Sequence, residues 1–141
     1  MQNLIASSLK YENGILRVLD QYLLPHQQAW HECHSVETMK ELIISLKMRG
    51  APLIGLGASL LVAHLAQQGG TQAALAKAID ELEATRPTAV NLMHCMATLR
   101  EALKSDDFVA AVVCSAERLF IEDIALCERM ATRGAELINS G

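Results

Sequence analysis

The chain has 141 residues, of which 51% are apolar and only 4% aromatic, so it can form one domain with an aliphatic core. The formal charge of −4 arises from interspersed acids and bases, which excludes the basic surface of a nucleic-acid-binding domain. Four cysteines without C-x-x-C spacing, and no basic signal region at the N-terminus, predict a cytoplasmic protein with free thiols.

The first third of the chain has the pattern of antiparallel strands. Apolar and polar residues alternate over 9–12, and Asn13-Gly14 supplies the two positive-φ residues of a tight hairpin turn. The return strand is expected at 15–19. A third extended segment is expected at 29–34.

From Ser35 onward the apolar residues recur at helical spacing, with the serine as an N-cap. The most apolar run, 52–66, is too short for a bilayer span and contains His64, so it predicts a buried core helix. Glycine and proline breaks place further helices at about 52–68, 71–84, 87–104 and 106–138. The last three residues, 139–141, have the composition of a turn, which suits either a natural end or a chain cut at a domain boundary.

Two junctions between helices combine an arginine with a nearby proline. In the first, one helix is expected to end with Lys47 and Arg49 near its C-terminus, and Gly50 then precedes Pro52, which is expected at the first position of the next helix. In the second, Arg86-Pro87 precedes an apolar helix. The first backbone N–H groups of a helix can bind an anion, and a guanidinium can form two hydrogen bonds with phosphate oxygens. The spacing therefore suggests two arginines around one phosphate, although two ordinary corners with solvated arginines fit the pattern as well.

Three segments in this order resemble the methylthioribose-1-phosphate isomerase family, which is related to the regulatory subunits of eukaryotic translation initiation factor 2B. They are MRGAPLIG at 48–55, TRPTAVNL at 85–92 and RGAELI at 133–138. The Tyr-x-Asn-Gly hairpin and Trp30 fit the same pattern, so the resemblance is to the N-terminal domain of the family and covers essentially the whole chain.

The resemblance implies that four residues contact the substrate, chiefly its phosphate: Arg49, Gly50, Ala51 and Arg86. It implies a cofactor-free homodimer that converts 5-methylthioribose 1-phosphate to 5-methylthioribulose 1-phosphate in methionine salvage. The acid–base residues of the family are a cysteine and an aspartate in a larger Rossmann-like C-terminal domain. No cysteine of this chain matches that motif, so we expect no catalytic residue here.

Other groups that could carry chemistry have simpler interpretations. In the segment around His31, Cys33 and His34, an extended backbone directs His34 away from the other two, so no metal site is expected, and His26 lies apart before it. The adjacent pair His94-Cys95 diverges on a helix, which favours core packing. For His64 we expect a core position with a backbone partner. Glu122-Asp123 is expected on a solvated helix face.

The expected fold is α+β and mainly α, with a β element over 1–34 and a bundle of about five helices over 35–141. The expected function is the substrate-binding part of the isomerase, with a phosphosugar as partner and neither nucleic acid nor membrane. A non-catalytic regulatory module, an isomerase of ribose 1,5-bisphosphate or 5-deoxyribose 1-phosphate, and a helical dimerisation domain remain alternatives. These sugars differ in the substituent at C5, and the sequence does not identify the residues that would contact it.

Overall fold

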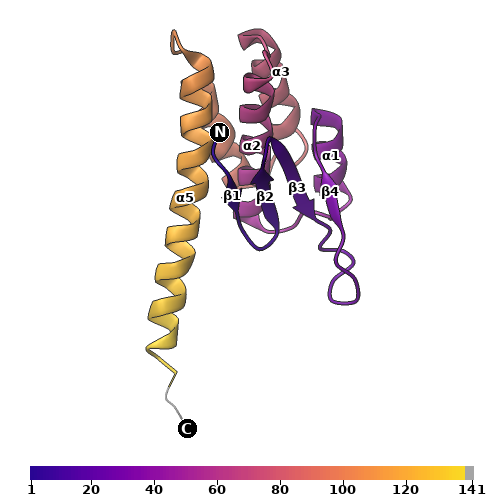
Figure 1. The fold of residues 1–141 in the computed structure, drawn as a ribbon, viewed down its shortest axis with the longest axis vertical. Helices are drawn as coiled ribbons and strands as arrows, with labels where there is room; N and C mark the ends of the chain where they lie inside the picture. The colour runs from indigo at the N-terminus through magenta and orange to yellow at the C-terminus, as the bar shows by residue number, and fades with distance from the viewer. Residues whose placement is uncertain (139–141) are drawn as a thin grey trace.

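The computed structural model describes residues 1–138 and shows a four-stranded antiparallel sheet followed by helices (Figure 1). The strands are β1 (Leu4–Ile5), β2 (Leu9–Glu12), β3 (Ile15–Leu19) and β4 (Trp30–Glu32). The helices over these residues are α1 (Val36–Ile44), α2 (Ala51–Gln67), α3 (Gln72–Glu83), α4 (Val90–Ala102) and α5 (Phe108–Ala135). The α+β, mainly α prediction is confirmed, and the turn expected at 139–141 lies outside the described residues.

The predicted hairpin is present, with strand order β1-β2-β3-β4 and Tyr11 opposite Leu16. Asn13 has a φ of 53° and Gly14 a φ of 78°, as a two-residue hairpin turn requires. Strand β1 was not predicted, because its two residues are too few to show an alternating pattern. The third extended segment is shorter than expected, since only three of its residues pair with β3.

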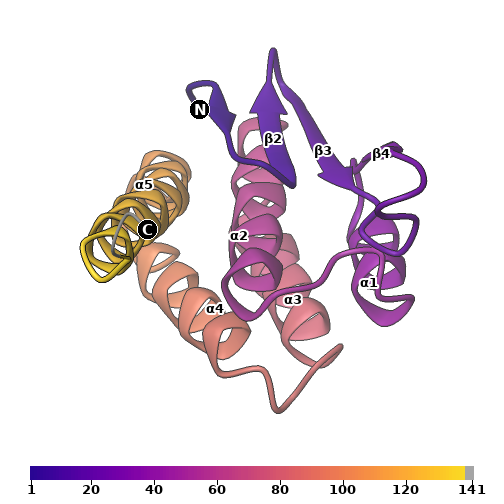
Figure 2. The ribbon, with the colours of Figure 1, turned by 90° about the horizontal axis from the view of Figure 1, so that it is seen from below.

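Helix α2 occupies the centre of the molecule, between the sheet and the other helices (Figure 2). Nearly every residue from Ile54 to Ala66 is buried, so the predicted core helix is confirmed. A helix that is apolar on all sides must be covered on all sides, and the sheet, α1, α3, α4 and α5 provide that cover. Within residues 1–138, no helix combines the length and apolarity that a bilayer crossing requires.

Two helix boundaries differ from the prediction, and both flank the arginine-proline junctions. Helix α1 ends at Ile44 because Leu46 adopts a φ of 58° and the chain turns, so Lys47 and Arg49 lie in a loop rather than in the last helical turn. Helix α4 begins three residues after Pro87, because residues 86–89 form a turn in which the Ala89 N–H donates to the Arg86 carbonyl at 2.9 Å.

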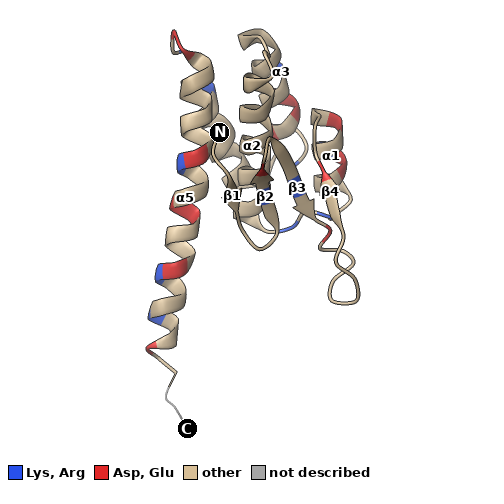
Figure 3. Ribbon diagram, in the orientation of Figure 1, with Lys and Arg blue, Asp and Glu red and all other residues tan. Residues whose placement is uncertain are grey.

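Helix α5 packs against the rest of the molecule mainly along its first half. Its fully buried residues end at Phe120. The C-terminal part of the helix extends past the other elements (Figure 1). Charged residues of both signs follow one another along this helix (Figure 3). The second half therefore contributes little to the core.

The close packing of α2 on α4 depends on Gly55. A Cβ at this position would lie 2.8 Å from Cys95 Sγ and 2.9 Å from the Asn91 carbonyl oxygen, both in α4. We expect Gly55→Ala to push the two helices apart and to lower the free energy of unfolding by about 1–3 kcal/mol, measured by chemical denaturation.

The matched control is Gly134→Ala in α5, where an added Cβ would meet no heavy atom within 4 Å. Since alanine favours the helix, this variant should keep the stability or raise it by up to about 1 kcal/mol. Equal stabilities for the two variants would contradict the proposed packing role of Gly55.

Candidate phosphate-binding site

The N-termini of α2 and α4 differ from the other helix N-termini in the described chain. Helices α1, α3 and α5 begin with side-chain caps, from Ser35, Thr71 and Asp107, each of which accepts a hydrogen bond from a first-turn backbone N–H. Helices α2 and α4 begin at Gly50 and Ala89, and neither has a side-chain cap. Their first N–H groups therefore remain available to an external acceptor.

These two uncapped ends line one pocket of about 370 Å³. The pocket contains three of the four predicted substrate residues, Gly50, Ala51 and Arg86, although Gly50 and Arg86 are 36 positions apart in the sequence. The remaining lining residues are Ile54, Thr88, Ala89, Val90 and Asn91. The sequence reasoning left Thr88 and Asn91 out, and their place at the start of α4 was the signal that could have included them.

Position 50, which lines this pocket, has a backbone conformation that favours glycine. Its φ of 106° is rarely adopted by other residues, and the nearest heavy atom to an added Cβ is Leu53 Cβ at 3.6 Å. Helix α2 then begins at Ala51, which places Pro52 at the second helical position rather than the expected first. Because Pro52 has no N–H and Ile54 donates to the Gly50 carbonyl at 3.2 Å, the N–H groups of Ala51 and Leu53 are the donors that α2 can offer.

The charges around the pocket are not neutralised by carboxylates. Among the seven arginines of the chain, all within residues 1–138, four form ion pairs, and Arg49, Arg86 and Arg129 are the three that form none in the described structure. Arg49 does not line the pocket itself but directly precedes Gly50, and its Nε donates to the Leu46 carbonyl at 3.2 Å. Both predicted arginines are exposed and able to meet an anion.

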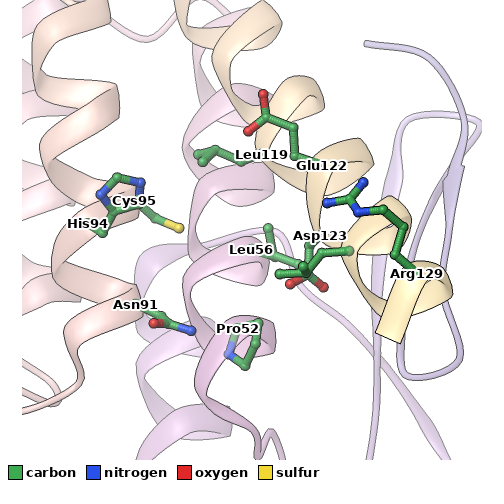
Figure 4. Close-up of a pocket in the computed structure, with 10 residues that line it drawn as sticks. Pro52, Leu56, Asn91, His94, Cys95, Leu119, Glu122, Asp123 and Arg129 are labelled. Atoms are coloured by element: carbon green, nitrogen blue, oxygen red, sulfur yellow. The ribbon is translucent and has the colours of Figure 1, made fainter. Parts of the chain in front are cut away.

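A second pocket of about 430 Å³ lies between α2, α4 and α5 (Figure 4). It shares Asn91 with the first pocket. The complete lining is Pro52, Leu56, Asn91, His94, Cys95, Leu119, Glu122, Asp123, Leu126 and Arg129. The acidic pair was expected on a solvated face: Glu122 is exposed, as predicted, whereas Asp123 is half-buried beside this pocket.

The cysteine in this second pocket is a poor nucleophile. Cys95 is buried against α2, and burial raises the pKa of its thiol, so the thiol stays protonated at neutral pH. Its neighbour His94 is exposed, as expected for adjacent residues that diverge on a helix. Burial also raises the pKa of Cys33, to about 12. Neither buried thiol is suited to acid–base chemistry.

Two histidines of the N-terminal third, His31 and His34, lie against carboxylates of the protein. His31 Nε2 lies 2.9 Å from Asp20 Oδ2, and His34 Nε2 lies 3.4 Å from Glu32 Oε2. Among residues 1–138, no three side chains with metal-binding groups lie close enough together to hold an ion.

His64 is buried in α2, as predicted, but its partner is a side chain and not a backbone group. The Tyr11 hydroxyl lies 3.3 Å from His64 Nδ1. Burial and the nearby His34 lower the pKa of His64, which favours the neutral ring in the core.

Comparison with known proteins gives relatives along the whole chain, although no protein-family model matches it. A methylthioribose-1-phosphate isomerase of Cronobacter sakazakii is 48% identical over all 141 residues, and one of Yersinia pestis is 48% identical over 139 residues. The match covers 42% of the first relative and 40% of the second, so the chain spans about two fifths of the length of these proteins.

Solved structures share the fold. A 5-methylthioribose 1-phosphate isomerase from Pyrococcus horikoshii has a TM-score of 0.87 at 28% identity, covering 97% of this chain and 42% of that one. The delta subunit of translation initiation factor eIF-2B from A. fulgidus has a TM-score of 0.81 at 31% identity, covering 95% of this chain and 42% of that one. The resemblance drawn from the three sequence motifs is thus confirmed: over its whole length, the chain is similar to part of the methylthioribose-1-phosphate isomerases and of a related initiation factor subunit.

Proposed function

We propose that this chain is the N-terminal, substrate-binding domain of a methylthioribose-1-phosphate isomerase and that it binds the phosphate group of the sugar. The observation that carries the proposal is the meeting of two uncapped helix N-termini, together with Arg86, in one pocket. Each N-terminus carries a partial positive charge and outward N–H donors, which together favour a phosphate. The isomerase relatives supply the substrate class.

The reaction explains why the enzyme must bind the phosphate group of the substrate firmly. Its C1 carries the phosphate, so the ring cannot open spontaneously as a free hemiacetal would. Conversion to the ketose then requires hydrogen transfer between C1 and C2 by positioned acid–base groups. Binding the phosphate next to C1 fixes the reacting carbon relative to those groups, which is the contribution we assign to Arg49, Gly50, Ala51 and Arg86.

The acid–base groups themselves belong, in our proposal, to the part of the isomerase that this chain does not span. The buried thiols stay protonated, and no other pair of acid and base borders the phosphate pocket among the described residues. The β element at 1–34 and the helices at 35–141 would then form one domain of a longer, cofactor-free enzyme. As the resemblance implies, we propose that this enzyme is a cytoplasmic homodimer.

A regulatory role is the second candidate, because an initiation factor subunit shares the fold at 31% identity. An isomerase converts a phosphosugar, whereas a regulatory module would turn over none. The intact protein should convert 5-methylthioribose 1-phosphate with a higher kcat/KM than ribose 1,5-bisphosphate or 5-deoxyribose 1-phosphate. Preference for one of those two sugars would identify a sister isomerase, and no turnover with any of them would favour the regulatory module.

The arginines provide the direct test of the phosphate site. In the intact protein, Arg49→Ala and Arg86→Ala should each weaken phosphosugar binding by about 1.5–3 kcal/mol, the range of a hydrogen bond to a charged group. Isothermal titration calorimetry with 5-methylthioribose 1-phosphate measures the change.

The matched control is Arg17→Ala. This arginine lies between the buried residues Leu16 and Val18, on the opposite face of β3, and pairs with Glu32 at 3.0 Å. Its removal should leave the affinity unchanged. If both site variants also keep the wild-type affinity, the two corners are ordinary helix junctions and the proposed phosphate site is wrong.

Our proposal assigns phosphate binding to this chain and the acid–base groups to another part of the isomerase, and this gives a separate prediction. The 141-residue chain alone should show no isomerase turnover with 5-methylthioribose 1-phosphate, since the proposed acid–base groups lie elsewhere. A coupled or NMR assay beside an intact isomerase as positive control measures this. Turnover that persists through rigorous purification and scales with the amount of this chain would contradict the assignment.

A further inference from the structure

Gln21, in the corner between β3 and β4, makes two hydrogen bonds with the loop that carries Arg49. The backbone N–H of Gln21 donates to the Lys47 carbonyl at 2.8 Å. Its side-chain Oε1 accepts the backbone N–H of Arg49 at 2.6 Å. Gln21 therefore contacts the loop at two points, on either side of Met48.

The position of Gln21 is itself fixed by its surroundings. Its side-chain amide also donates to Ser8 Oγ at 3.2 Å, which orients the carbonyl oxygen toward Arg49. The preceding residue, Asp20, is only 4% exposed, and its carboxylate accepts hydrogen bonds from the Tyr22 N–H at 3.1 Å and from His31 at 2.9 Å. Although burial opposes ionisation, these two hydrogen bonds lower the pKa of Asp20, so the corner keeps a charged and fully partnered anchor.

The loop offers few other constraints at Arg49. Met48 is completely buried, and its N–H donates to the Leu42 carbonyl at 3.0 Å, so the chain is fixed just before the arginine. Gly50 follows with a φ of 106° and no Cβ to restrict it. Between a fixed methionine and a permissive glycine, the hydrogen bond that the Arg49 N–H donates to Gln21 Oε1 defines the direction of the Arg49 backbone.

We propose that Gln21 is a positioning residue for the phosphate site, which holds the segment 47–50 so that Arg49 and the N-terminus of α2 meet the phosphate together. This inference rests on the proposed function of the site. Gln21 does not line the pocket, so it acts through Arg49 and Gly50 and touches no reacting atom.

The role of Gln21 predicts a specific pattern of kinetic effects. Replacing Gln21 by methionine keeps the length of the side chain but removes the acceptor for the Arg49 N–H. Without that acceptor the loop has more conformations available, and binding must select one of them at a cost in affinity. We expect about a tenfold loss in phosphosugar affinity, the order of one hydrogen bond, with kcat changed less than about twofold.

The experiment uses the intact protein and its Gln21→Met variant. Calorimetry gives the dissociation constant for inorganic phosphate, and steady-state kinetics with 5-methylthioribose 1-phosphate separates KM from kcat. Hydrogen exchange of the segment 47–50 reports on the loop directly, and the exchange of Arg49 should accelerate in the variant. The slow exchange expected for the Met48 amide should persist, because Leu42 still accepts its hydrogen bond.

Three further variants isolate the cause. Gln28→Met changes an exposed glutamine in the same connection and should have no effect. Ser8→Ala removes only the bond that orients the Gln21 amide, and it should weaken phosphate binding less than Gln21→Met does. Arg86→Ala tests the phosphate site independently, because Arg86 lies in a different junction.

The outcomes separate the two proposals. A loss of affinity in both Gln21→Met and Arg86→Ala, with Gln28→Met unchanged, supports the positioning role. A loss in Arg86→Ala alone overturns the role of Gln21 and leaves the phosphate site standing. No loss in either variant overturns both proposals. If Gln21→Met does not fold, wild-type exchange decides: the Arg49 amide must exchange much more slowly than the exposed Gln28 amide, and equal rates overturn the role of Gln21.

Discussion

The N-termini of α2 and α4 open into the same pocket, and this convergence needs a physical explanation because both ends carry partial positive charge. Each helix end is equivalent to roughly half an elementary charge, so the two ends repel one another at short range. Side-chain caps at three other helices satisfy the corresponding N–H groups, yet these two ends have none. The arrangement is stabilised best by an anion, and Arg86 adds positive charge instead of removing it.

Packing in the core keeps the N-termini of α2 and α4 close together despite the repulsion between them. Helix α2 is apolar on all sides and is buried by every neighbouring layer, so its axis has little freedom to tilt away. Gly55 allows α4 to approach within one turn of the N-terminus of α2, where any larger residue would meet Cys95 and Asn91. Burial of aliphatic side chains thus offsets the repulsion between the two helix ends, so the proposed anion site would be preorganised at a cost to the stability of the domain.

Local patterns were sufficient to predict much of this architecture. The Asn13-Gly14 turn requires only the two residues that form it, and the apolar run of α2 identifies a buried helix without knowledge of its neighbours. The anion site was indicated by arginine, glycine and proline at helix starts, and the family motifs then pointed to the same positions. What the sequence alone could not supply was the meeting of the two corners, since it depends on how α2 and α4 pack.

The features missed by sequence reasoning are those determined by non-local contacts. The end of α1 depends on Leu46 and the start of α4 depends on the turn at Arg86, and tertiary packing selects both. Gln21 follows a strand and shows no motif, and its two hydrogen bonds to the loop, with residues 26 and 28 positions later, exist only in the folded chain.

The position of Gln21 also shows how binding and folding are linked in this domain. The proposed phosphate pocket is built from helix ends, and in our proposal the sheet corner sets the direction of Arg49 through the hydrogen bond between Gln21 and the Arg49 N–H. A ligand that engages Arg49 and the start of α2 therefore stabilises the packing of the sheet against the helices, because it binds only the conformation in which those parts are assembled. The sheet lines neither pocket, but through Gln21 it would contribute to the proposed substrate site.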